Sequence, residues 1–176
     1  MNNQVNNIAY LGIGSNLGNK SENIEKAIDL IGKIETTSIE SVSSFYETKP
    51  FGNLEQENFV NAAVKISTGL EPLILFSELK SVEKRLGRKE GMRWGPREMD
   101  IDILFYNDLI FSDEIITLPH KGVIYRDFVL VPLMEIEPDL IHPIYKKKIN
   151  NFLMDLKSKF ILNKISSEFK IKDNII

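Results

Sequence analysis

Apolar and polar positions recur along the chain with the two periods that are typical of strands and helices. Residues 8–13 form a short, mostly apolar run that contains a glycine, which predicts a buried strand. Apolar residues in the segment 21–31 recur at i, i+3, i+4 and i+7, the spacing of one helix face. The segment 35–46 is rich in serine, threonine and β-branched residues in loose alternation. We therefore expect an antiparallel strand there, with one face in water.

The middle of the chain continues the same two patterns. Residues 59–67 predict a strand, and a helix is expected from Pro72 to a glycine cap near Gly87. Residues 88–98 hold two glycines and a proline, which indicates a loop. Residues 99–106 predict the next strand.

The C-terminal segments and the order of the elements define the expected fold. Helices are predicted over residues 126–135 and 149–160, followed by a polar tail. The preceding order β-α-β-β-α-β resembles a ferredoxin-like core. We therefore expect an α+β fold with a mainly antiparallel sheet, helices packed on it and extra C-terminal helices. Residues 1–176 are expected to form a single domain, with flexible tails at 1–7 and about 170–176.

Composition and charge exclude several kinds of function. The chain has 176 residues, of which 43% are hydrophobic, enough to fill a core. Its net charge of −3 argues against a dedicated binder of duplex DNA or a polybasic membrane binder. It has no cysteine, which excludes disulfides, zinc–thiolate sites and thiol nucleophiles, and two histidines are too few for a histidine-rich metal cage. With neither a signal-peptide pattern nor an apolar run of about 20 residues, we expect a cytoplasmic protein.

The arginines are concentrated in one part of the sequence. Of 22 basic residues only five are arginine, and all five lie between positions 85 and 126. The segment 84–97 holds six basic residues and one acidic residue, a local charge of +5. Arginine's planar, five-donor head suits bidentate contact with phosphate oxygens. A charge run of this kind is also typical of a solvated surface, so this segment alone leaves both interpretations open.

Two carboxylates directly follow the arginine-rich segment. Asp100 and Asp102 are two residues apart on the predicted strand, so both point to one face, roughly 6.6 Å apart along the strand. Two acids this close are costly unless they are protonated, paired with arginine or bridged by a divalent cation. Oxygen ligands of this kind suit Mg²⁺, which takes its remaining ligands from water and substrate phosphates. The pair predicts a metal–triphosphate site, and the alternative is a surface pair neutralised by arginines.

The glycine-rich segment 12–18 follows the first predicted strand. Its GxGxxxG spacing is one residue longer than the dinucleotide-binding fingerprint, and no GxxxxGK[ST] sequence is present. The strand expected over 35–46 also lacks the continuous apolar run of a buried parallel strand. We therefore interpret 12–18 as a tight strand-to-helix turn beside a site and reject a Rossmann fold.

The segment WGPREMDIDILFY at 94–106 resembles the 6-hydroxymethyl-7,8-dihydropterin pyrophosphokinase family of folate biosynthesis. Other segments resemble the family in the same order along the chain: AYLGIGSNLGNK at 9–20, SSFYETKPFG at 43–52, QENFVNAA at 56–63 and LPHKGVIYRDFVLVPLMEIEPDLIHP at 118–143. The resemblance implies a stand-alone enzyme that transfers pyrophosphate from ATP to the pterin hydroxymethyl oxygen and releases AMP. We expect a monomer whose partners are ATP and 6-hydroxymethyl-7,8-dihydropterin, with no nucleic acid, membrane or obligate protein partner.

The resemblance also implies roles for individual residues. Those implied to be catalytic are Arg88, Arg97, Asp100 and Asp102. Those implied to bind ATP are Glu83, Arg88, Trp94, Arg97, Ile103, Thr117, His120 and Arg126. Those implied to bind the pterin are Thr48, Phe51, Phe59, Asn61, Asp100 and Phe128. Asp100 and Asp102 would hold two Mg²⁺ ions when ATP is bound.

Within the implied pterin site, side chains and backbone groups have different roles in binding. Phe59 and Phe128 occupy the family's two stacking positions, and Asn61 occupies the position that hydrogen-bonds the ring. Thr48 and Phe51 lie where backbone groups of a loop contact the pterin edge. A flat heterocycle between two rings, with an amide at its edge, is sound recognition chemistry.

Three other functions stay open from the residues alone. An RNA-binding module on this layout would need exposed strand aromatics with basic neighbours, whereas the predicted site strand presents carboxylates. A nucleotide-sugar transferase also uses a DxD sequence with a metal, but a chain this short fits that class poorly. A regulatory nucleotide binder with the same fold would differ only in lacking turnover. Lys121 and Ile115 differ from the tyrosine and the basic residue that members of the resembled family often carry there.

Overall fold

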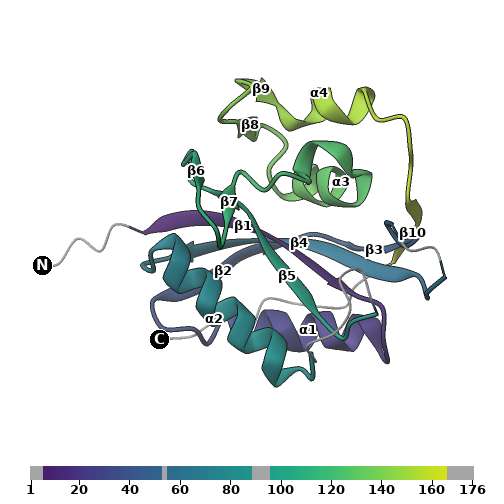
Figure 1. Cartoon of the computed structure of the whole chain (residues 1–176), viewed down its shortest axis with the longest axis horizontal. Helices are drawn as coiled ribbons and strands as arrows, with labels where there is room; N and C mark the ends of the chain where they lie inside the picture. Colours follow the sequence, from purple (N-terminus) through teal and green to yellow (C-terminus); the bar gives the residue numbers. More distant parts are fainter. Residues whose placement is uncertain (1–5, 53–54, 89–95, 166–176) are drawn as a thin grey trace, which may run out of the picture.

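The computed structural model describes residues 6–52, 55–88 and 96–165, which form a six-stranded sheet between two layers of helices (Figure 1). The strands follow the order β10-β3-β4-β1-β5, and β2 pairs with β4 on the same side as β3. All of these pairs are antiparallel. The strand bounds are β1 Asn7–Ser15, β2 Thr37–Val42, β3 Phe45–Thr48, β4 Phe59–Thr68, β5 Asp100–Tyr106 and β10 Ile161–Ile165. The expected fold with a mainly antiparallel sheet is confirmed.

The helices lie on both faces of the sheet (Figure 1). One face is covered by α1 (Lys20–Ile31) and α2 (Pro72–Arg85), and the other by α3 (Asp127–Ile136) and α4 (Ile149–Met154). After α2, Gly87 has a φ of +97°, the left-handed conformation expected of a glycine cap. Two small strand pairs, each antiparallel, and one short 3₁₀ helix complete the fold: β6 Phe111–Ser112 with β7 Thr117–Leu118, β8 Ile141–His142 with β9 Lys147–Lys148, and the 3₁₀ helix Val123–Tyr125. None of the helices in the described part of the chain has the length and apolar character needed to cross a bilayer.

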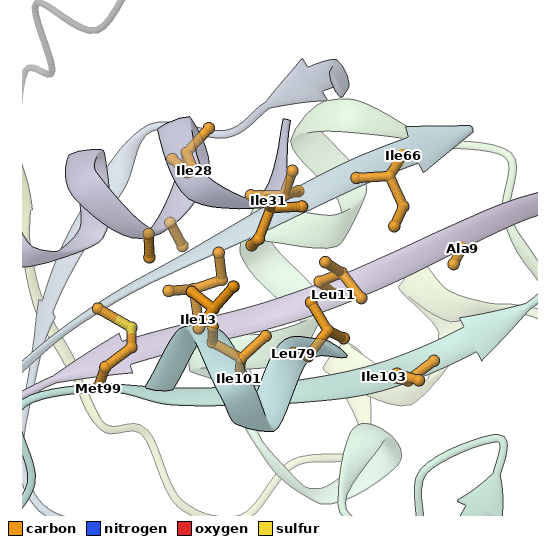
Figure 2. Packing of buried hydrophobic residues seen from close by; sticks show 14 of the residues in the cluster. Ala9, Leu11, Ile13, Ile28, Ile31, Ile66, Leu79, Met99, Ile101 and Ile103 are labelled. Atoms are coloured by element: carbon orange, nitrogen blue, oxygen red, sulfur yellow. The ribbon is translucent and has the colours of Figure 1, made fainter. Parts of the chain in front are cut away.

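One face of α1 packs against the sheet, as its spacing predicts. Its buried residues, each no more than 1% exposed, are Ile24, Ala27, Ile28 and Ile31. They belong to the same core as alternate residues of β1 and β5, among them Leu11, Ile13 and Ile101 (Figure 2). Removing this aliphatic surface from water is the main force that holds the layer in place. The packing fixes β1 and β5 from one side and leaves their other face for a site.

The prediction of one continuous strand over 35–46 is wrong. β2 ends at Val42 and β3 begins at Phe45, with two serines between them. The Ser43 hydroxyl accepts a hydrogen bond from the Ala63 backbone N–H at 2.9 Å. A side-chain oxygen therefore replaces the backbone carbonyl that an uninterrupted strand would offer, and the two strands pair with successive parts of β4.

The helix predicted over 149–160 is also wrong in its second half. α4 ends at Met154, and Ile161–Ile165 form β10 where a polar tail was expected. The buried Asp127 carboxylate accepts hydrogen bonds from the N–H groups of Phe160 and Ile161, at 2.8 and 3.0 Å. These N–H groups are thus held by a tertiary contact, which local propensity does not reveal.

Candidate active site

The paired carboxylates lie on the face of β5 opposite the α1–α2 layer. Ile101 is fully buried and Ile103 is 5% exposed, and both pack in the core beneath that layer. Because side chains alternate along a strand, Asp100 and Asp102 project from the other face, where the residues at the start of α3 also lie. The prediction that the two aspartates share one face of the strand is confirmed.

Two glycines of β1 leave the space over the carboxylates open. In the strand register Gly14 is paired with Asp100 and Gly12 with Asp102. A Cβ atom at Gly14 would lie 2.6 Å from Asn61 Oδ1, so a side chain there would displace that amide. The glycines and the acids line one cavity of about 710 Å³, including the part open to solvent. Both glycines lie within β1, on the floor of the site. β1 runs two residues beyond the predicted strand 8–13, so Gly14 belongs to the strand and not to the turn expected after it.

Asp100 is held by two arginines. Arg88 Nη1 lies 2.9 Å from its Oδ1, and Arg97 Nη1 lies 3.0 Å from its Oδ2. Burial by itself raises the pKa of Asp100, but the two guanidinium groups outweigh this effect and hold that pKa below its usual value. Asp100 is thus ionised and neutralised by arginine, one of the alternatives considered for the pair.

Asp102 lies in a different environment. None of the ion pairs among the described residues includes it, although Lys80, His120 and Arg126 lie near enough to act on its charge. Burial, and then the negative charge of Asp100, raise the pKa of Asp102. The environment of Asp102 therefore disfavours the charged form of its carboxyl group.

A magnesium site at these carboxylates needs further ligands from a substrate. Over the described ranges, no cluster of three or more acidic, histidine or cysteine side chains is placed to hold a metal ion. Mg²⁺ keeps several waters and takes phosphate oxygens as ligands, so it does not require a complete protein cage. Asp100 and Asp102 therefore fit a metal that binds together with a phosphate-bearing substrate.

Glu83 lies beneath the site and does not line the cavity. Its side chain is buried, and one oxygen accepts hydrogen bonds from Ile101 N–H and Lys80 Nζ, each at 2.7 Å. The other oxygen pairs with Arg88 Nη1. Burial raises the pKa of Glu83 in spite of these cations. Its carboxylate is occupied in holding β5 and Arg88.

A second cavity adjoins the first and shares Asp102 and His120 with it. Ile103 and Thr117, both predicted to bind ATP, line this second cavity. His120 Nδ1 accepts a hydrogen bond from the Gly122 N–H at 3.1 Å. Burial lowers the pKa of His120, so its ring is neutral near pH 7. Five of the residues predicted to bind ATP thus line these two neighbouring hollows: Arg97 and Arg126 the first, Ile103 and Thr117 the second, and His120 both.

Arg126 enters the first cavity from the position just before α3. Its Cζ atom lies 4.5 Å from the centre of the Phe51 ring. Its Nε is buried and has no hydrogen-bond partner among the described residues. A Cβ atom at Gly122 would lie 2.8 Å from Arg126 Cζ, so the glycine leaves the room in which the guanidinium lies. An anion in the cavity would satisfy the unpaired donor.

The apolar end of the first cavity gathers the residues predicted to bind the pterin. Its lining there includes Thr48, Phe51, Phe59, Asn61 and Phe128. Asn61 Nδ2 donates to Thr48 Oγ1 at 2.8 Å, which fixes the amide with its oxygen on the side of Gly14. The rings of Phe51 and Phe128 lie 6.3 Å apart between centres, at 60°. The predicted residues are therefore brought together, whereas Trp94 lies outside the described residues and its role stays a prediction.

Sequence reasoning missed two residues that organise the site. Asn16 is fully buried. Its Oδ1 accepts a hydrogen bond from Arg97 N–H at 2.8 Å, and its Nδ2 donates to Gln56 Oε1 at 3.0 Å. It therefore joins the end of β1, the segment before β4 and the segment before β5. Lys80, the second residue, donates from Nζ to the Ile101 carbonyl oxygen at 2.9 Å. The only signal for Asn16 was an amide directly after a glycine-rich strand.

Known proteins are similar in sequence to this chain over most of its length. The family model of 7,8-dihydro-6-hydroxymethylpterin-pyrophosphokinase (HPPK) matches residues 10–138. The curated 2-amino-4-hydroxy-6-hydroxymethyldihydropteridine pyrophosphokinase of Aquifex aeolicus is 46% identical over 143 residues, which cover 81% of this chain and 88% of that protein. The protein of the same name from Haemophilus influenzae is 43% identical over 135 residues, which cover 77% and 84%.

Solved structures agree on the fold. The crystal structure of Plasmodium falciparum HPPK-DHPS with pteroate is similar to this chain with a TM-score of 0.68 and 17% identity, over 88% of this chain and 44% of that one. At this identity the likeness shows the ferredoxin-like fold alone. The family assignment comes from the sequence match, which covers well over half of the chain and confirms the resemblance carried by its motifs. The chain therefore belongs to the 7,8-dihydro-6-hydroxymethylpterin-pyrophosphokinase family.

Proposed function

We propose that the cavity over Asp100 and Asp102 is where pyrophosphate passes from ATP to the hydroxymethyl oxygen of 6-hydroxymethyl-7,8-dihydropterin, with release of AMP. The family and its curated members are pyrophosphokinases, so this chain is a diphosphotransferase of folate synthesis. The assignment of the reaction to this cavity rests on the residues that line it. One hollow joins a carboxylate pair, two guanidinium groups and an aromatic end with a fixed amide.

The reaction requires charge to be neutralised along the triphosphate. The pterin oxygen attacks the β-phosphorus, and the bond from that phosphorus to the oxygen bridging to the α-phosphorus breaks. The hydroxyl proton is released, and AMP leaves with the bonding electron pair. Catalysis of such a transfer is largely positioning and electrostatic stabilisation. Arg97 and Arg126 line the cavity and would contact the phosphate oxygens.

Asp100 and Asp102 would hold Mg²⁺, two ions when ATP is bound. Mg²⁺ bound there would offset the negative charge of the phosphates and orient them. Arg88 and Arg97 keep Asp100 ionised, as a metal ligand must be. Burial and the nearby charge of Asp100 raise the pKa of Asp102, and a bound cation would offset both effects. Glu83 would act through Arg88, and Trp94 would contact ATP from its loop.

The two substrates would occupy different ends of the site. The pterin ring would stack between Phe59 and Phe128, and Asn61 Oδ1 would accept a hydrogen bond from a ring N–H or amino group. Ile103, Thr117 and His120 would contact the nucleotide in the adjoining cavity. We also propose that the enzyme is a monomer that uses ATP in the cytoplasm and needs no obligate protein partner.

Phosphorus NMR of the purified protein with ATP, Mg²⁺ and 6-hydroxymethyl-7,8-dihydropterin tests the proposal. Pterin-dependent formation of AMP together with a new pyrophosphate ester is the expected result. Formation of ADP would instead show transfer of one phosphoryl group and would overturn the proposed attack at the β-phosphorus. Tight ATP binding without turnover would favour a regulatory nucleotide binder.

A further inference from the structure

A buried carboxylate ties the C-terminal segment to the start of α3. Asp127 is 4% exposed. Its Oδ2 accepts hydrogen bonds from Phe160 N–H at 2.8 Å and from Ile161 N–H at 3.0 Å, while its Oδ1 accepts one from Phe128 N–H at 2.8 Å. The Asp127 side chain thus fixes the backbone at Phe128 and at Phe160 together. Hydrogen bonds to an ionised acceptor are stronger than neutral ones.

The Phe160 ring packs against two rings of the pterin end of the cavity. Its centre lies 5.4 Å from that of Phe51 and 5.8 Å from that of Phe128, at interplanar angles of 59° and 84°. These are distances and tilts at which aromatic rings attract one another. Phe160 does not line the cavity itself. Phe160 therefore supports the rings of Phe51 and Phe128, which do line the cavity.

The backbone of the same segment is joined to the other wall of the cavity. The Phe160 carbonyl oxygen accepts a hydrogen bond from Lys49 N–H at 2.9 Å. The following strand, β10, pairs with β3, in which Ile161 stands opposite Thr48. Thr48 in turn holds the Asn61 amide. The segment lies beyond residue 138, where the match to the family model ends.

We propose that Phe160 is a positioning residue for the pterin, anchored by Asp127. It holds the ring of Phe128, and that of Phe51 beside it, in the orientation that leaves a slot against Phe59 for a flat heterocycle. The inference rests on the proposed function in one respect, because that function assigns the pterin to this end of the cavity. Ile103 and Thr117, which are assigned to the nucleotide, line the adjoining cavity, whereas Arg126 lies against Phe51. Support by Phe160 therefore acts on pterin affinity more than on ATP affinity.

Calorimetry with Phe160→Ala tests the assignment. The protein is titrated with 6-hydroxymethyl-7,8-dihydropterin in the presence of Mg²⁺ and a non-hydrolysable ATP analogue, and separately with the analogue alone. Loss of two ring contacts is expected to weaken pterin binding about tenfold. The affinity for the analogue and kcat at saturating pterin should stay within about twofold of wild type. Phe160→Tyr, which keeps the ring, should restore pterin binding.

Two further variants separate positioning from general stability. Phe152→Ala removes a ring that packs on His142 and Tyr145 but lines no part of the first cavity, so it should leave pterin affinity unchanged. Asp127→Asn keeps the size of the anchor and removes its charge, and it should weaken pterin binding in the same direction as Phe160→Ala. It also provides the test if Phe160→Ala fails to fold.

The outcomes distinguish this inference from the proposed function. Equal losses of pterin and nucleotide affinity, or unchanged pterin affinity in both Phe160→Ala and Asp127→Asn, would overturn the positioning role. If the wild-type protein forms no AMP yet binds pterin in a Phe160-dependent way, the proposed reaction fails and the positioning role stands. If wild type forms AMP and the variants keep its pterin KM, the proposed reaction stands and the positioning role fails.

Discussion

The Arg88 nitrogen that contacts Asp100 Oδ1, at 2.9 Å, is the same nitrogen that contacts the buried carboxylate of Glu83. One guanidinium is therefore shared between an acid beneath the site and an acid within it. An arriving phosphate can take the place of Asp100, while Glu83 keeps the arginine attached to α2. We therefore expect Arg88 to act after the substrate is bound.

Replacing Arg88 should therefore affect the chemical step more than the binding of ATP. In Arg88→Ala we expect kcat to fall by about 100-fold or more, with ATP affinity changed by less than about threefold. Single-turnover rates and ATP titration measure the two quantities. Arg85→Ala removes an exposed arginine three residues earlier and serves as the matched control. A loss confined to ATP affinity would contradict the late role of Arg88.

The variants Asp100→Asn and Asp102→Asn should both abolish Mg²⁺-dependent turnover while leaving the fold intact. Each removes one of the two ionised oxygen donors that a divalent metal would use. Rates measured across a Mg²⁺ titration, with circular dichroism as the check on folding, give the result. Near-normal rates in both variants would contradict the metal assignment.

The same two variants should shift thermal stability in opposite directions at pH 7 without metal. The folded pKa of Asp102 is raised, so its stabilising contribution is present below the unfolded pKa of about 3.9 and is lost as pH rises through the folded pKa. Burying this carboxyl group is therefore unfavourable at pH 7, and Asp102→Asn should raise Tm. The folded pKa of Asp100 is lowered, so its contribution is present at pH 7 and Asp100→Asn should lower Tm. Calorimetric scans measure these shifts. If Tm changed in the same direction in both variants, the two aspartates would not have these different charge environments.

Adding a single methyl group at Gly14 should impair pterin binding. The new Cβ would lie 2.6 Å from Asn61 Oδ1 and would turn the amide away from the cavity. We expect the pterin KM of Gly14→Ala to rise about tenfold, because a fixed hydrogen-bond acceptor is lost from a buried site. The ATP KM should not change. Gly32→Ala, where a Cβ would meet its nearest neighbour at 3.4 Å, is the control and should behave as wild type.

His142 should make the protein less stable in acid. Burial among aromatic rings lowers the pKa of His142 in the folded state. The unfolded chain therefore binds the proton more readily, and stability falls as pH drops below the unfolded value of about 6.5. His142→Asn keeps an acceptor for the Ile144 N–H and removes the titration. Urea unfolding at pH 7.5 and 5.5 should show a smaller loss in the variant than in wild type.

The features that were predictable from the sequence depend on neighbours in the chain. The shared face of Asp100 and Asp102 follows from alternation along one strand, and the buried face of α1 follows from the helical period. The same holds for the start of α2, where Pro72 occupies the first helical turn. Local patterns also located the region of the site, because its arginines and acids are adjacent in sequence.

The features that were missed depend on partners far away in the chain. The break between β2 and β3 relies on the bond between Ser43 and Ala63, and β10 relies on Asp127, more than thirty residues earlier. The opposite pKa shifts of Asp100 and Asp102 depend on which acid the arginines reach in space. Hydrophobic periodicity carries no information about such contacts. The sequence therefore predicted the carboxylate pair but not the difference between the electrostatic environments of its two members.

β5 lies at the end of the sheet, with β1 as its one neighbouring strand in the described structure. An open strand edge is a template on which another chain can add a strand, which leads to aggregation. Here the outward N–H and C=O groups of Ile101 are bonded to Glu83 and Lys80, and the carbonyl of Leu104 accepts a hydrogen bond from His120 N–H. Glu83, which holds Arg88, thus also helps to block edge-to-edge association between copies of the protein, together with Lys80 and His120.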